Sequence, residues 1–251
     1  MEHITSRKNP YIMQLRALAS DAALRRERGE TVLDGLKLLG EALASGAEPK
    51  GVLCSEPDAL PDGLRCPVYA APQELVSYAS PVKNSPGPVF SLAMPQLRRP
   101  ERIGSAIVLE DMQDPGNVGT LIRTANALGV DAVILAGGCA DHTSPRAVRA
   151  SMGAAFRQYV VECAVSELAG LMEDFGLTLY GTALDEGAAD IRTVDLSGAA
   201  IAIGNEGHGL SAALLSACRG RLIIPMRPGS ESLNAAAAGA LVMWEMVHKR
   251  L

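Results

Sequence analysis

The chain contains 251 residues, of which 48% are hydrophobic and 20% charged, and this length suits one large domain or two modest ones. No apolar run approaches the roughly 18 residues of a membrane span, and no signal peptide opens the chain, so we expect a soluble, cytoplasmic protein. The five cysteines form no CxxC pair and the four histidines lack metal-ligand spacing. This scatter argues against a disulfide framework and predicts no metal site.

The net charge of −5 and the isoelectric point near 5.4 are not those of a typical nucleic-acid-binding protein. Positive charge is nevertheless concentrated locally, and such clusters matter more to a phosphate backbone than the sum over the chain. The clusters are residues 6–10, residues 25–28, residues 98–102, and the group Arg146, Arg149 and Arg157. Each of them fits either a nucleic-acid contact or an ordinary solvated helix face.

The first part of the chain mixes helical and strand-like segments. In chain order these are two helices between Pro10 and about Gly46, β-like runs at 50–55 and 66–71, a helix at 72–79 and a strand at 87–94. They predict a small α/β unit that ends near Met94. The polar, proline-bounded segment 96–104 is typical of a linker, so we expect one domain at 1–95 and another at 105–251.

Beyond the linker, strands and helices alternate. The predicted strands are 106–110, 131–136, 158–163, 177–183, 199–203 and 221–226, and the predicted helices are 117–129, 145–155, 166–176, a short one after Leu210 and a last one from about Leu233. This alternation predicts an α/β fold with a mostly parallel sheet covered by helices on both faces. Ligands bind such sheets at the carboxyl ends of the strands, so the loops there are the informative ones.

The first unusual loop opens the segment 110–129. Pro115 and Gly116 break the chain there, and Asn117 is a good helix cap. Arg123 follows within the predicted helix. It is either a solvent-facing helix residue or a fixed cation for a phosphate or a developing oxyanion, which the rigid fork of its guanidinium suits.

Two further loops are rich in glycine or in polar side chains. The segment 204–211, "GNEGHGLS", fits neither the dinucleotide nor the phosphate-loop pattern, and Glu206 is either a functional carboxylate or a cap for the helix after it. The segment 224–239 sets Ser232 and Asn234 before an alanine-rich helix, where Ser232 is also a good N-cap. That last helix is apolar nearly all round, so a second subunit could cover it.

These loops, in this order and spacing, resemble the three signature motifs of the SpoU-type, TrmH-like branch of the SPOUT superfamily, the S-adenosylmethionine-dependent RNA ribose 2′-O-methyltransferases. The matching segments are 108–129, 144–157, 200–211 and 222–241. The resemblance covers essentially all of 105–251. It implies a C-terminal trefoil knot and a homodimer with the active site at the subunit interface.

The segments 4–18 and 30–43 resemble a small RNA-binding domain, similar in fold to ribosomal protein L30e, that many ribosomal-RNA members of this family carry in front. Two positions depart from the family's usual pattern. Asp34 and Gly35 stand where the family more often has glutamate and glycine, and "SPGPVF" stands where it more often has glutamine and glycine.

The resemblance also implies the site. The residues expected to hold S-adenosylmethionine are Ile203, Gly204, Asn205, Gly207, Ile224, Met226 and Leu233, and those expected in the active site are Asn117, Arg123, Glu206, Ser232 and Asn234. A guanidinium stays protonated, so we expect Arg123 to bind the target phosphate and stabilise the forming alkoxide, with Glu206 orienting Arg123 or a substrate group. The front domain favours 23S ribosomal RNA as the substrate. The alternatives are a transfer-RNA methyltransferase and a non-catalytic RNA-binding protein.

Overall fold

The computed structural model describes residues 1–185, 187–227, 229 and 232–250, and divides them into two compact units. Unit 1 comprises Met1–Gln96 together with Asp141–Arg157, and unit 2 comprises Leu97–Ala140 and Gln158–Leu251. The chain therefore leaves the first unit close to the expected linker. It differs from the expected division in one respect, because the segment 141–157 packs with unit 1 rather than with the parallel sheet that surrounds it in sequence.

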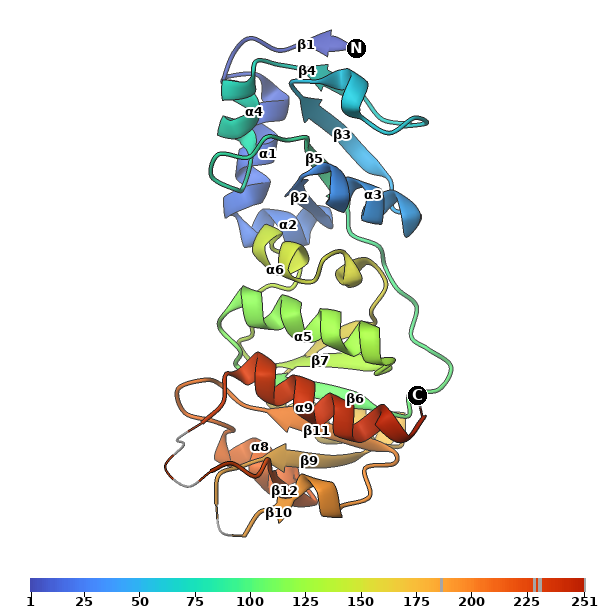
Figure 1. Cartoon of the computed structure of the whole chain (residues 1–251), viewed down its shortest axis with the longest axis vertical. Helices are drawn as coiled ribbons and strands as arrows, with labels where there is room; N and C mark the ends of the chain where they lie inside the picture. Colours follow the sequence, from blue (N-terminus) through green and yellow to red (C-terminus); the bar gives the residue numbers. More distant parts are fainter. Residues whose placement is uncertain (186, 228, 230–231, 251) are drawn as a thin grey trace. The chain divides into compact units, whose positions relative to one another are not determined.

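Unit 1 is built on a five-stranded mixed sheet in the order β1-β4-β3-β5-β2 (Figure 1). Its strands are β1 (Glu2–His3), β2 (Glu30–Asp34), β3 (Pro49–Cys54), β4 (Val68–Ala70) and β5 (Val89–Ala93). Its helices are α1 (Pro10–Ser20), α2 (Ala22–Arg28), α3 (Leu36–Ala44), α4 (Gln73–Ala79) and α6 (Pro145–Ala150), with short 3-10 turns at Pro57–Ala59 and Ala154–Phe156. One hydrophobic cluster joins α1 and α4 to this sheet.

The prediction of two helices between Pro10 and Gly46 is wrong, because a strand interrupts that region. Gly29 takes a left-handed conformation (φ 62°) and ends α2, and β2 follows at once. Val32 and Leu33 are both buried, since β2 is covered on both faces and pairs with β5 in antiparallel register. A strand buried on both faces shows no alternation of apolar and polar residues, so its residues also fit a helical spacing.

A nearly buried ion pair holds the start of the segment 141–157 within unit 1. Arg25 and Asp141 have only 6% and 11% of their side chains exposed, and the guanidinium donates two hydrogen bonds, of 2.9 and 2.6 Å, to one carboxylate oxygen. Thr143 donates to the other oxygen through its backbone and its hydroxyl. Burial opposes ionisation of this carboxyl, but the hydrogen bonds from Thr143 and Arg25 outweigh it and lower the pKa of Asp141.

Asp141→Asn should therefore lower the free energy of unfolding by about 3 kcal/mol at pH 7, because it leaves the Arg25 guanidinium buried beside a neutral amide. A carboxyl whose pKa is lowered by folding stabilises the protein above its ordinary pKa, and this contribution is lost as the pH falls through the lowered value. The difference in the free energy of unfolding between wild type and Asp141→Asn should therefore become smaller in acid. Urea unfolding at pH 7 and pH 3 measures both effects, with the exposed Asp62→Asn as control; equal stabilities at pH 7 would contradict the expectation.

Unit 2 contains a seven-stranded sheet in the order β10-β12-β9-β11-β6-β7-β8, and each pair of described neighbouring strands is parallel. The strands are β6 (Ala106–Glu110), β7 (Ala132–Ala136), β8 (Val160–Cys163), β9 (Thr178–Thr182), β10 (Ala189–Asp190), β11 (Ala199–Ile203) and β12 (Gly220–Ile223). The helices are α5 (Pro115–Leu128), α7 (Leu168–Phe175), α8 (Ala212–Ala217) and α9 (Ala235–Val247), with 3-10 turns at Val165–Glu167, Ile191–Thr193 and His248–Arg250. The predicted α/β class and parallel sheet are confirmed.

Helices cover both faces of this sheet. Side chains of α7 and α8 share a core with Val108 and Ile134 on one face, whereas α5 and α9 lie side by side in front of the sheet in Figure 1. These two helices pack closely, because a side chain at Gly239 would meet Leu121 at 2.2 Å. None of the described helices is long and apolar enough to cross a membrane.

Candidate active site

A pocket of about 610 Å³ lies at the carboxyl ends of β9, β11 and β12 and at the start of α9. Its walls come from the loops that follow these strands, as expected for a parallel sheet. All seven residues expected to hold the cofactor line it: Ile203, Gly204, Asn205, Gly207, Ile224, Met226 and Leu233. Glu206 and Ser232 line it as well. The wall from Thr182 to Asp185 was not among the expected site residues, although its position directly after a predicted strand could have indicated it.

The glycine-rich loop after β11 folds back on itself. Asn205 and Gly209 exchange two backbone hydrogen bonds of 3.1 and 2.9 Å, and Gly209 adopts a left-handed conformation (φ 70°). At Gly204 a Cβ atom would lie 2.2 Å from the carbonyl carbon of Gly209 and 2.3 Å from the nitrogen of Leu210. Only glycine fits at 204, because the atoms in the way belong to the backbone of the same loop.

The side chain of Asn205 fixes this loop to the loop after β6. Its Nδ2 donates to the backbone oxygen of Asp111 (2.8 Å), and its Oδ1 accepts from the nitrogen of Gly207 (2.7 Å). Asp111 has a positive φ of 50° and its carboxylate accepts from the nitrogen of Gly138 (2.6 Å), in the loop after β7. Three loops at the carboxyl edge are thereby joined by hydrogen bonds, and Asn205 helps to shape the pocket that it lines.

A buried carboxylate that the sequence analysis did not single out supports the end of the same loop. Glu110 is 1% exposed, and it accepts hydrogen bonds from the backbone nitrogen (2.7 Å) and hydroxyl (2.5 Å) of Ser211. Ser211 also caps α8 by accepting from Leu214. Glu206 is therefore not the cap of this helix. The signal in the sequence was the acidic residue that ends the otherwise apolar strand "AIVLE".

Three of the residues expected in the active site form one hydrogen-bonded chain. Asn117 donates from Nδ2 to the Glu206 carboxylate (2.8 Å), and Asn234 donates from Nδ2 to the Asn117 side-chain oxygen (3.5 Å). The three residues come from three different loops or helix starts. The Asn117 side chain therefore connects the Glu206 carboxylate to Asn234 at the start of α9, and each of these side chains limits the orientation of the one it binds.

The helix caps differ from the sequence-based expectations. Asp114, not Asn117, caps α5 by accepting from the nitrogen of Gly116, because the helix already begins at Pro115. Asn234, not Ser232, caps α9 by accepting from the nitrogens of Ala236 and Ala237. The later start of α9 leaves Ser232 exposed in the loop that lines the pocket. The earlier start of α5 leaves the Asn117 side chain available for the contact with Glu206.

Arg123 is the one expected active-site residue that stands apart. It lies on the exposed side of α5 and does not line the pocket. Among the described residues it has no hydrogen-bond or ion-pair partner. The Glu206 carboxylate accepts a hydrogen bond from Asn117, and within the described residues it makes none with Arg123. A cation that is exposed and not neutralised by the described residues of its chain is suited to an external anion.

Two partly buried thiols beside this edge do not supply a nucleophile. Burial raises the pKa of Cys139 to about 11, and burial together with the Glu110 carboxylate raises the pKa of Cys218 to about 11. Each thiol donates a hydrogen bond to a backbone oxygen, Leu109 for Cys139 and Leu214 for Cys218. Both groups stay protonated near neutral pH, whereas covalent catalysis by cysteine needs the thiolate.

Comparisons with known proteins agree on one family. Residues 104–244 match the SpoU rRNA Methylase family. The 23S rRNA (guanosine(2553)-2′-O)-methyltransferase RlmP of Bacillus subtilis is 31% identical to the chain, and the match covers 98% of the chain and 99% of that protein.

Two solved structures share the fold over nearly the whole chain. The AdoMet-bound rRNA methyltransferase from Sinorhizobium meliloti matches with a TM-score of 0.88 and 27% identity, covering 100% of this chain and 98% of that one. The SpoU methyltransferase AviRb from Streptomyces viridochromogenes, in complex with AdoMet, matches with a TM-score of 0.85 and 28% identity. The match covers 97% of this chain and 98% of that one.

Proposed function

Because the chain belongs to the SpoU rRNA Methylase family, we propose that it transfers a methyl group from S-adenosylmethionine to a ribose 2′-hydroxyl of 23S ribosomal RNA. The methyltransferase activity and the use of S-adenosylmethionine go with the family. One observation carries the proposal furthest: residues from separate loops, each expected to hold the cofactor, line one pocket. Its volume of about 610 Å³ is within the range of small-molecule sites.

Ribosomal RNA is favoured over transfer RNA because the similarity extends through unit 1. RlmP matches 98% of this chain, so the match includes the segments that precede the catalytic region. We propose that residues 1–95 form an L30e-like RNA-binding domain, that 96–104 link it to the catalytic domain at 105–251, and that the C-terminal part is threaded into a trefoil knot. The reaction would take place in the cytoplasm, where ribosomal RNA is available.

The pocket residues would hold the cofactor largely through their backbone atoms, since five of the expected seven positions are glycine, isoleucine or leucine. S-adenosylmethionine supplies a methyl group activated on a sulfonium centre. The protein contributes position, because orientation of a bound nucleophile is worth roughly 7–11 kcal/mol. Asn117, Glu206 and Asn234, connected by hydrogen bonds, would fix the edge of the site against which the ribose is placed.

Arg123 would bind the phosphate next to the target ribose and stabilise negative charge on the 2′-oxygen as its proton leaves. A guanidinium does not lose its proton in proteins, so Arg123 is not the base. Its exposure and its lack of a partner within the described chain keep its donors available for RNA. Ser232 would anchor the third loop at the pocket wall.

We propose that the enzyme is a homodimer joined through α9. Leu241 and Trp244 are 49% and 50% exposed on this helix, which packs beside α5, the helix that carries Arg123. Large exposed apolar side chains gathered on one helix are typical of a protein interface. A partner docked there would place its own surface close to Arg123, in agreement with an active site shared by two subunits.

Trp244→Glu should convert this dimer to a monomer, because burying an unpaired carboxylate in an apolar interface weakens association by about a hundredfold or more. Light scattering coupled to size exclusion should give twice the 26.2 kDa of one chain for the wild type and 26.2 kDa for the variant. Met13→Glu, at an equally exposed apolar position in unit 1, should leave the mass unchanged. A wild type that is monomeric at every concentration would contradict this proposal.

The substrate proposal is tested with tritiated S-adenosylmethionine and unmodified transcripts of 23S, 16S and transfer RNA, incubated separately with the purified protein. Label should enter 23S RNA with at least about tenfold preference over the other two. Preferential labelling of transfer RNA would favour the transfer-RNA alternative. Cofactor binding without label in any RNA would favour a non-catalytic RNA-binding protein.

A further inference from the structure

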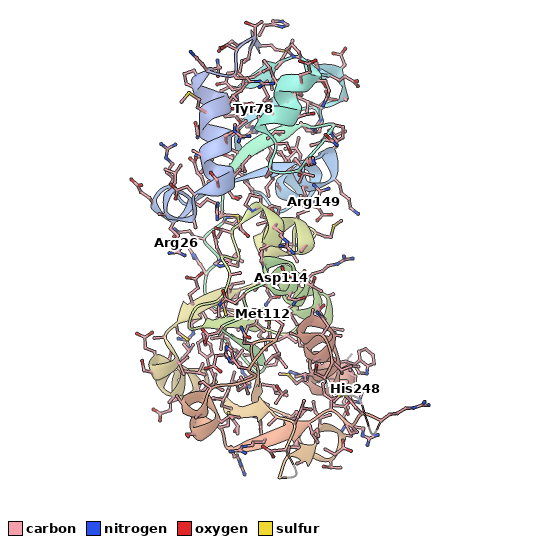
Figure 2. All side chains as sticks on the ribbon, turned by 90° about the vertical axis from the view of Figure 1, so that its left-hand side faces the viewer. Arg26, Tyr78, Met112, Asp114, Arg149 and His248 are labelled. Carbon is pink, nitrogen blue, oxygen red and sulfur yellow. The ribbon has the colours of Figure 1, made fainter. Side chains whose placement is uncertain are left out.

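Two arginines of unit 1 share one aromatic ring. The guanidinium carbon of Arg7 lies 4.6 Å from the ring centroid of Tyr78, and that of Arg16 lies 4.4 Å from it. Arg16 also donates a 2.7 Å hydrogen bond to the backbone oxygen of Tyr78. Tyr78 is labelled in Figure 2, where α4 lies beside α1. Arg7, Arg16 and Tyr78 are called here the Arg-Tyr-Arg cluster.

The cluster holds positive charge that the described part of the chain does not neutralise. Arg7 and Arg16 are exposed and neither forms an ion pair there, whereas Arg25, Arg149 and Arg157 in the same unit each bind a carboxylate. Residues 3–20 contain three basic residues, Lys8 included, and no acidic one. In a chain with a net charge of −5, this is a local reversal of sign.

The ring holds the two guanidinium groups no more than about 9 Å apart. Like charges at this separation repel each other, and an anion that binds both guanidinium groups offsets the repulsion. Contact with the ring face orients each guanidinium and restricts its motion, so less conformational entropy is lost when its N–H groups donate to a phosphate. The arrangement is suited to a chain of phosphates rather than to a carboxylate of the same protein.

We propose that the Arg-Tyr-Arg cluster binds the phosphodiester backbone of the RNA substrate. The proposal rests on the proposed function for the identity of the RNA, but its geometry belongs entirely to unit 1. Phosphate contacts of this kind fix the register of a protein on a nucleic acid without reading its sequence. The cluster therefore contributes affinity and position, while the choice of the methylated nucleotide depends on other contacts.

The test is filter binding of labelled, unmodified 23S rRNA transcript to the full-length protein without cofactor. Arg7→Ala/Arg16→Ala should weaken binding about tenfold and reduce the slope of log K against log salt by about 1.5, as expected for the loss of two phosphate contacts. The double variant Lys50→Ala/Arg65→Ala removes the same charge from exposed positions elsewhere in unit 1 and should bind nearly as well as wild type. An equal loss of RNA affinity in both double variants would overturn the proposal, because the loss would then follow from the change in net charge and not from the position of the arginines.

Variants of the ring separate its role from that of the charges. Tyr78→Phe keeps the aromatic face and should bind RNA like wild type, whereas Tyr78→Ala should weaken binding about three- to tenfold because the arginines lose their support. Circular dichroism and S-adenosylmethionine affinity should be unchanged in all these variants, which shows that a loss of RNA binding is not a loss of fold. Wild-type affinity in Tyr78→Ala and in Arg7→Ala/Arg16→Ala would refute the cluster as a contact.

Failure of this proposal and failure of the proposed function give different results. If the wild type transfers methyl groups to 23S rRNA and Arg7→Ala/Arg16→Ala shows the wild-type KM for RNA, the function stands and the cluster does not contribute. If the wild type transfers no methyl group to any RNA, the reaction is wrong. Binding of the transcript still reports on the cluster in that case, since it is measured without cofactor and without turnover.

Discussion

Arg123→Ala should transfer methyl groups to 23S rRNA at least about a hundredfold more slowly than wild type while binding S-adenosylmethionine with unchanged affinity. The rate falls because the variant lacks a fixed cation beside the ribose 2′-oxygen, which becomes negative in the transition state. The unchanged affinity follows from geometry, because Arg123 does not line the pocket that would hold the cofactor. Single-turnover transfer with saturating RNA, together with calorimetric titration of the cofactor, measures both quantities.

Two further variants make this result specific. Arg123→Lys keeps the charge but not the planar fork, so it should recover only part of the lost rate. Arg219→Ala removes an arginine that is equally exposed in unit 2 and should leave the rate unchanged. Wild-type turnover by Arg123→Ala would show that this residue takes no part in the reaction.

Gly204→Ala should reduce the affinity for S-adenosylmethionine by about a hundredfold or more. The added methyl group would lie 2.2 Å from the backbone of Gly209, which cannot move unless the hydrogen bonds between Asn205 and Gly209 break. The loop would open, and with it one wall of the pocket. Calorimetric titration of the cofactor measures the change.

Gly170→Ala is the matched control for this substitution. Gly170 lies exposed in α7 with open space at the Cβ position, so alanine there should stabilise the protein by about 0.5–1 kcal/mol and leave cofactor affinity unchanged. Tight cofactor binding by Gly204→Ala would mean that the loop does not need the closed conformation.

Because predicted strands and helices alternate regularly along residues 105–251, most elements of unit 2 could be predicted from sequence. The strands β6, β7 and β11 are short, apolar and bounded by glycine or polar residues, so their type and position could be predicted from sequence. In unit 1, the strand β2 could not be predicted, because its burial on both faces removes the alternation of apolar and polar residues that marks a half-buried strand. The packing of 141–157 with unit 1 depends on contacts between residues far apart in sequence, such as Arg25 with Asp141.

The site could be predicted as a set of residues more readily than as a set of contacts. The motifs indicated which loops gather at the pocket, since these loops follow strands that end at one edge of the sheet. They did not indicate that Glu206 binds Asn117, because this depends on where α5 begins. Nor did they indicate that Gly204 is needed by its own loop, since such close approaches exist only in the folded chain.

The measurement that tests the central claim most directly is the chemical identity of the methylated product. Unmodified 23S rRNA transcript is incubated with wild-type protein and S-adenosylmethionine, digested to nucleosides and analysed by mass spectrometry, and the position is mapped by resistance of the linkage to alkali. The account predicts one 2′-O-methylated nucleoside at a single alkali-resistant position, with none formed by Arg123→Ala. Methylation of a base, with every linkage still cleaved by alkali, would contradict it.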